Sequence, residues 1–114
     1  MTQPLQLLYS PFPSLDAART VAKLLVEEQL VACCNLLPVG ESHYIWEGQP
    51  TVAQEIILLA KTTPALAGAA TALIAAHHPY SCPAILALDA TANADFAQWA
   101  FAQLKDFKNQ HEGG

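Results

Sequence analysis

The stretch from residue 62 to residue 88 contains no Asp, Glu, Lys or Arg, and this stretch constrains the fold most. An uncharged segment of this kind is either a membrane span or part of a buried core. A membrane span needs about 20 continuous apolar residues. Pro79 and Pro83 interrupt the stretch, and the helix expected between Pro64 and His77 is too short to span a bilayer. We therefore expect a core helix, then a loop, then a short strand.

The composition points to a folded chain with more apolar surface than one subunit of this size can bury. The chain has 114 residues, of which 53 % are hydrophobic and 13 % charged, with a formal net charge of −5. This balance excludes a disordered chain, which combines low hydrophobicity with high charge. It also argues against nucleic-acid binding, which needs clustered basic residues. The five basic residues are scattered, at Arg19, Lys23, Lys61, Lys105 and Lys108.

Apolar spacing and turn residues predict three helices. The first is capped by Ser14, carries Asp16 in its first turn and runs to about Gln29. The second covers residues 64–77 and ends before Pro79, with Thr63 as its cap. The apolar face expected for it is Leu66, Ala69, Ala70, Leu73, Ile74 and His77. The third begins after Asn93, and its expected stripe is Phe96, Ala100, Leu104 and Phe107, followed by a frayed polar tail after Lys108.

Four strands are expected between these helices. They cover residues 3–10, 31–46 with a bend at 38–40, 54–62 and 85–89. The second and third strands form a hairpin with a long arm and a turn at residues 47–50. The order predicts one α+β domain over residues 1–114, a ferredoxin-like βαββαβ sandwich with an extended β-hairpin arm and a C-terminal helix.

Motifs of common enzyme classes are missing from the sequence. It contains no G-x-G-x-x-G or P-loop fingerprint and no G-x-S-x-G elbow. No Ser, His and Asp arrangement suggests a nucleophile with an adjacent base. An enzyme with a site shared between subunits is therefore the least favoured interpretation.

The segment from His77 to Pro83 is one candidate for chemistry. Imidazole and thiolate are ligands for copper and zinc, so His77 and His78 are candidate metal ligands, with Cys82 as a further donor. The alternative is a helix end with one packed and one exposed histidine. Spacing along the helix places His77 on the apolar face.

The N-terminus shows no secretory signal, so we expect a cytoplasmic protein with reduced thiols.

Aromatic residues on the expected arm are the second candidate. Tyr44 and Trp46 share one face of the strand and either line a ligand cleft or pack at a subunit contact. Lys61 ends a buried strand, where a lone cation is a reasonable anion contact. Lys61 is alternatively a partner for Glu47 or Glu55.

Four stretches in a fixed order resemble the CutA family of divalent-cation tolerance proteins over nearly the whole chain. They are residues 25–35, 44–48, 55–62 and 78–80. The resemblance implies a ferredoxin-like fold, a tight trimer similar to the PII signalling proteins, and a hairpin that reaches the next subunit. It also implies a link to tolerance of divalent metals, chiefly copper, without an enzymatic activity.

The resemblance assigns a metal role to His77 and His78. In the family pattern a Cys stands at the position of Ser10, and a Glu usually stands at the position of Ala84. Both of these donors are missing from this chain. Cys82 would have to replace the thiol.

These observations lead to a functional expectation and one alternative. We expect a non-enzymatic homotrimer, unusually resistant to heat, that binds copper, another divalent metal or a small anion in a cleft between subunits. Otherwise no cofactor is expected. The residues expected to line the cleft are Trp46, Lys61, His78 and Tyr80. The alternative is a structural or protein-interaction module without a metal site; neither nucleic acid nor a membrane is an expected partner.

Overall fold

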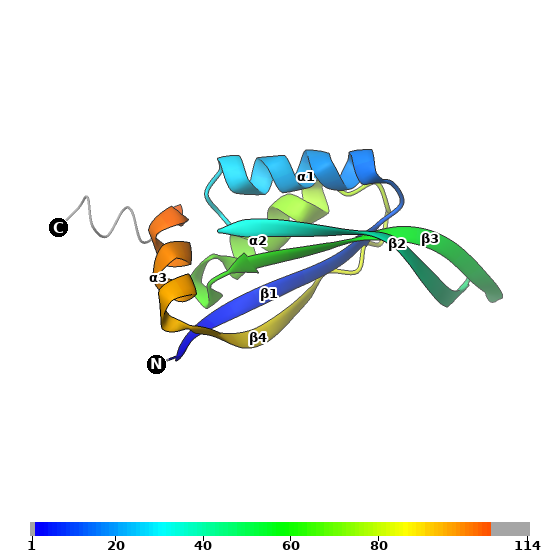
Figure 1. Ribbon diagram of the computed structural model, residues 1–114. Coiled ribbons are helices and arrows are strands. Elements are labelled where there is room, and N and C mark those ends of the chain that lie inside the picture. The colour runs from blue at the N-terminus through cyan, green and yellow to red at the C-terminus, as the bar shows by residue number, and fades with distance from the viewer. Residues whose placement is uncertain (1, 106–114) are drawn as a thin grey trace.

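The computed structural model describes residues 2–105, which form a four-stranded antiparallel sheet and three helices (Figure 1). The strand order is β2-β3-β1-β4. This order, with α1 and α2 after β1 and β3, confirms the predicted ferredoxin-like βαββαβ arrangement followed by a third helix. The elements are β1 (Thr2–Phe12), α1 (Leu15–Glu27), β2 (Cys33–Trp46), β3 (Gln49–Thr62), α2 (Pro64–His77), β4 (Leu86–Asn93) and α3 (Ala94–Gln103).

Three strands extend further than the sequence predicted. β4 continues past Asp89 to Asn93, because it stays paired with β1 as far as Thr2. In β1 and β3 the predicted bounds stop short of prolines that the strands in fact include. β1 continues through Pro11 to Phe12. At Pro11 the strand has β3 as a neighbour but no longer has β4, which begins at Leu86 opposite Tyr9. A missing N–H costs little where a strand is paired on one side. For the same reason Pro50 lies inside β3, which begins at Gln49 and not at Gln54.

Helix α1 follows the predicted pattern closely. The Ser14 side chain accepts a hydrogen bond from the Ala17 N–H at 3.2 Å, which confirms the predicted cap. The apolar face is fully buried at Ala18, Val21 and Leu25. The helix ends at Glu27 rather than Gln29, because Gln29 has a φ of 59° and leaves the helical conformation.

Helix α2 carries most of the uncharged stretch and packs on both α1 and β1. Its buried residues are Leu66, Ala67, Ala70 and Ile74. Ala69 and His77 are exposed, so the predicted face was wrong at these two positions. Ala67 is buried in addition to the predicted face, because the helix packs on both α1 and β1. Within residues 2–105, no helix has the length and apolar character that crossing a membrane requires.

The core lies between the sheet and its helices. Leu8 and Phe12 of β1, Leu58 of β3 and Ile74 of α2 are fully buried in it. Burial of large side chains of this kind is worth about 1.5–3 kcal/mol each relative to exposure, and it provides the main stabilising contribution.

The ends of β2 and β3 form an arm that leaves the sheet. β1 pairs with β3 no further than Ile56, so beyond that point the two arm strands pair only with each other. A two-residue turn at Glu47 and Gly48, both with positive φ, closes the hairpin. The Cα radius of gyration is 15.3 Å, above the roughly 13 Å expected of a compact domain of this size, so the arm projects from the body.

A bulge bends the arm where it leaves the sheet. The register of β2 against β3 shifts between Leu37 and Gly40. A Cβ at Gly40 would come within 3.0 Å of the Glu55 carbonyl oxygen, so glycine permits this close approach of the two strands. The bend sets the direction of the arm.

Helix α3 lies at the end of the sheet opposite the hairpin tip (Figure 1). Asn93 is its N-cap, although its side chain makes no capping hydrogen bond. Of the predicted stripe, Ala100 and Leu104 are buried and Phe96 is half-buried against the core. Phe107 and the tail after Lys108 lie outside the described residues.

Ser14 and Thr63 provide a matched test of this account of the helix ends. Ser14→Ala should lower the free energy of unfolding by about 1 kcal/mol, because it removes the bond to the Ala17 N–H. Thr63→Ala should cost clearly less, since Thr63 makes no side-chain capping bond. Urea unfolding of both variants measures the difference; equal losses would contradict the account.

Candidate ligand pocket

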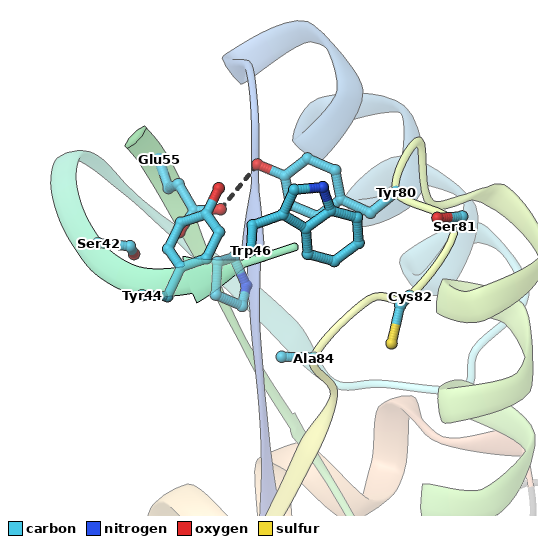
Figure 2. A pocket seen from close by; sticks show the side chains of 9 residues that line it. Ser42, Tyr44, Trp46, Glu55, Tyr80, Ser81, Cys82 and Ala84 are labelled. Carbon is cyan, nitrogen blue, oxygen red and sulfur yellow. Dashed lines mark hydrogen bonds between the residues drawn. The ribbon is translucent and has the colours of Figure 1, made fainter. Parts of the chain in front are cut away.

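A pocket of about 500 Å³ lies between the arm and the loop that joins α2 to β4 (Figure 2). This volume is in the range of small-molecule sites. The residues that line it are Pro11, Ser42, Tyr44, Trp46, Glu55, Tyr80, Ser81, Cys82 and Ala84. The pocket therefore joins residues from β1, both arm strands and the loop.

Strand alternation explains the arm side of the pocket. Ser42, Tyr44 and Trp46 are two residues apart on β2, so their side chains point to one face. Glu55 is paired with Gly40, which belongs to the same alternating series. The bulge and the lack of a side chain at Gly40 bring this set over the loop.

Tyr80 and Glu55 connect the loop to the arm. The Tyr80 hydroxyl donates a hydrogen bond to Glu55 Oε2 at 2.7 Å (Figure 2). Burial, together with this bond and the nearby carboxylate, raises the pKa of Tyr80 far above its usual value. The hydroxyl therefore stays protonated and keeps donating at neutral pH.

His78 supports Tyr80 from behind. Its ring stacks on Phe12 at a centroid distance of 4.1 Å and lies 5.1 Å from the Tyr80 ring. The Tyr80 N–H donates to Nδ1 at 3.1 Å, so Nε2 carries the proton and donates to the Pro11 carbonyl oxygen at 2.8 Å. Burial lowers the pKa of His78, against smaller opposing effects of the Pro11 bond and Glu55. The imidazole is thus neutral and uses both nitrogens to position the loop.

The structure brings together three of the four residues predicted to bind a ligand. Trp46 and Tyr80 line the pocket, and His78 contacts Tyr80. Lys61 lies elsewhere: it pairs with Cys33 at the far end of the hairpin, donates to Asn35 and lies 5.8 Å from the centroid of the Phe96 ring. Lys61 and the hairpin tip are separated by about 40 Å of extended strand. The expected alternative partners Glu47 and Glu55 lie on the arm, away from it.

The predicted metal ligands are not gathered in one chain. His77 is exposed, and its Nδ1 bonds to the Leu73 carbonyl oxygen at 3.1 Å, whereas His78 is the packed histidine. The helix spacing had suggested a packed His77, but the chain leaves the helix at His78 ahead of Pro79. Cys82 is exposed, and the Ser10 hydroxyl donates to the Ala84 carbonyl oxygen at 2.8 Å.

A resident metal does not fit the described part of one chain. Across residues 2–105, no group of three His, Cys, Asp or Glu side chains is close enough to hold an ion. Both nitrogens of His78 are already engaged, and the Cys34 thiol is inert because burial raises its pKa to about 12. Metal ligation by His77 and His78, with Cys82 as a further donor, stays a prediction.

Sequence reasoning missed Glu55 as a pocket residue. Glu55 is 6 % exposed. It directly precedes the apolar run of β3, where that strand begins to pair with β1 as well as β2. A carboxylate at the edge of a buried strand was the available signal, because such a group needs a partner. Its partner, Tyr80, is distant in sequence.

The neutral state of His78 gives the stability a pH dependence. The folded-state pKa lies below 6.5, so as the pH falls below about 6.5 the unfolded state takes up a proton that the folded state refuses. The free energy of unfolding should fall from pH 7 to pH 5. His78→Gln should flatten this slope, whereas His77→Gln at the exposed neighbour should not. Denaturant unfolding at several pH values measures it, and an unchanged slope in His78→Gln would refute the assignment.

Comparisons with known proteins agree with this geometry. The family model for the CutA1 divalent ion tolerance protein matches residues 6–103. The divalent-cation tolerance protein CutA of Thermus thermophilus is 43 % identical over 88 residues, 76 % of this chain and 85 % of the relative. A crystal structure of CutA1 from Oryza sativa superposes with a TM-score of 0.87 at 31 % identity, covering 92 % of this chain and 97 % of that one.

A second solved structure gives the same result. CutA1 from Ehrlichia chaffeensis superposes with a TM-score of 0.83 at 36 % identity, covering 87 % of this chain and 94 % of that chain. The family match over residues 6–103 spans both arm strands and the pocket loop. The chain belongs to the family of CutA1 divalent ion tolerance proteins.

Proposed function

We propose that this protein acts in divalent-cation tolerance as a non-enzymatic homotrimer that binds a small ligand in the pocket between its arm and the α2–β4 loop. Family membership supports the tolerance role. The pocket supports ligand binding. A non-enzymatic role is supported by His78, which is neutral and has no nitrogen free to act as a general base.

The observation that carries the assembly part is exposed apolar surface along two sheet edges. β2 and β4 are the outer strands, and an uncovered edge readily pairs with another chain. Leu86 and Leu88 on β4 are about half exposed, and Ile45 and Val52 on the arm are more than half exposed. Patches of this kind mark protein contacts. The stoichiometry of three follows the assembly that the family resemblance implies.

A metal would act in this proposal through donors from more than one subunit. His77 and Cys82 are exposed, so they are accessible to copper or another divalent ion together with groups of a neighbouring chain. A cytoplasmic location is part of the same proposal, and three free cysteines support it, because reduced thiols are typical of that compartment. If no metal binds, an interaction module that recruits another protein through the trimer surface is the remaining interpretation.

Leu88 tests the assembly. Leu88→Glu should dissociate the trimer, because it places a charge in an apolar subunit contact. Val26→Glu on α1 is the matched control, since Val26 is 47 % and Leu88 48 % exposed. Sedimentation velocity should find three chains together for the unmodified protein and the control, with a melting temperature that rises with protein concentration. A stable single chain in the unmodified protein would contradict the proposal.

His77 tests the metal part. Titration of copper and zinc into the trimer should show binding that weakens at least tenfold in His77→Ala and in the His77→Ala/His78→Ala double variant. His43→Ala, at an exposed histidine paired with Glu41 on the arm, is the control and should bind normally. Equal affinity in all four proteins would remove the metal role and favour the interaction module.

A further inference from the structure

Among residues 2–105, Glu55 is a buried carboxylate without a cationic partner. Its residue is 6 % exposed, and the side-chain hydrogen bond that reaches it comes from the Tyr80 hydroxyl to Oε2. The ion pairs within residues 2–105 involve other acids, Glu27 and Glu41. Buried carboxylates are usually paired with a positive charge, because burying an isolated charge is costly. Glu55 also lines the pocket, so the missing positive charge has a place to bind.

Aromatic side chains surround the same space. Tyr44 and Trp46 from the arm and Tyr80 from the loop line the pocket with Glu55 (Figure 2). The electron-rich faces of Trp and Tyr rings attract cations, and they do so most effectively for cations with an apolar surface. The residues that line the pocket include no Lys or Arg. His78 contacts Tyr80, and its Nδ1 accepts the Tyr80 N–H while Nε2 donates to the Pro11 carbonyl oxygen, so the ring carries one proton and adds no positive charge.

Hydrogen bonds hold Tyr80, one of the three aromatic residues of the pocket, in position. Tyr80 is fixed at its hydroxyl by Glu55 and at its N–H by His78, and the His78 ring is held by Pro11 and Phe12. The loop beyond it is held by the bond from Ser10 to Ala84. A side chain that is held in place before the ligand binds loses less conformational entropy on binding.

We propose that this pocket binds an organic monocation of the methylated ammonium type, with its methyl groups against Tyr44, Trp46 and Tyr80 and its charge near Glu55. The inference rests on the proposed function, because it names the ligand class of that same pocket. A bare metal ion suits the pocket less, since metal ions need several donor atoms and only Glu55 and Cys82 offer strong ones here. An anion would meet a carboxylate and no basic side chain.

Choline and dimethylbutanol test the inference on the intact trimer. The two probes have the same shape, but a carbon replaces the charged nitrogen in dimethylbutanol. Calorimetric titration should show choline binding about tenfold or more tightly than dimethylbutanol, and acetate should not bind, as expected for a charge-dependent aromatic site.

Three variants test whether choline binds in this pocket. Glu55→Gln keeps the size of the side chain and an acceptor for Tyr80, and should weaken choline binding about tenfold while removing the preference over dimethylbutanol. Trp46→Leu should weaken choline binding to a similar extent. Trp99→Leu on α3 is the control, because Trp99 is 49 % exposed against 51 % for Trp46 and lies outside the pocket; it should bind choline normally.

The outcomes separate this inference from the proposed function. Equal binding of choline and dimethylbutanol, or of acetate in preference to choline, would overturn the organic cation but leave a ligand-binding trimer. No binding of choline by an intact trimer would also overturn the inference. Sedimentation of the same samples reports the assembly independently, and a single chain there would contradict the proposed function instead.

Discussion

The hydrogen bond between the Tyr80 hydroxyl and the Glu55 carboxylate joins two parts of the molecule that the backbone alone leaves apart. The arm begins where the pairing of β1 with β3 ends, at Ile56. The α2–β4 loop comes before Leu86, where the pairing of β1 with β4 starts. Without this bond, the arm and the loop would each have one side that contacts no other part of residues 2–105. The bond closes them around a pocket, and the neutral His78 holds Tyr80 in the position that the bond requires.

The two departures from the family pattern occur at one point of this structure. The resemblance implies a thiol at Ser10 and a carboxylate at Ala84, and both are replaced. The Ser10 hydroxyl donates directly to the Ala84 carbonyl oxygen, and Ser10 is fully buried. A polar contact within the chain therefore stands where the family pattern places metal donors. The remaining soft donor, Cys82, lies on the exposed side of the same loop.

The order of the elements was predictable because apolar spacing and capping residues act locally. Ser14, the face of α1 and the helix start at Pro64 all agreed with the structure. Strand lengths were less predictable, since Pro11 and Pro50 are tolerated only because their strands have one neighbour there, which is a tertiary property. Val21 and Leu25 could be placed in the core, but the burial of Ala67 on α2 could not be predicted.

The position of the aromatic residues beside the pocket was predictable, and the position of the charged residues was not. Trp46 and Tyr80 were identified from clustering alone. Lys61 lies away from the pocket of one chain, as the register of the expected antiparallel hairpin already indicates, and its place in a cleft between subunits stays a prediction. Glu55 needed the fold, because its partner comes from a loop 25 residues away in sequence. His78 is the packed histidine and His77 the exposed one, the opposite of what helical spacing predicted. Pro79 ends the helix, so the position of His78 does not follow from helical spacing.

A crystal structure of the assembled protein would show whether the bond between Tyr80 and Glu55 closes the pocket in the trimer. We expect three chains whose apolar strand edges are covered by neighbours, with the Tyr80 hydroxyl still bonded to Glu55 and the pocket open beside it. An arm folded away from the α2–β4 loop, with Glu55 paired to a basic side chain of another subunit and the pocket filled, would contradict it.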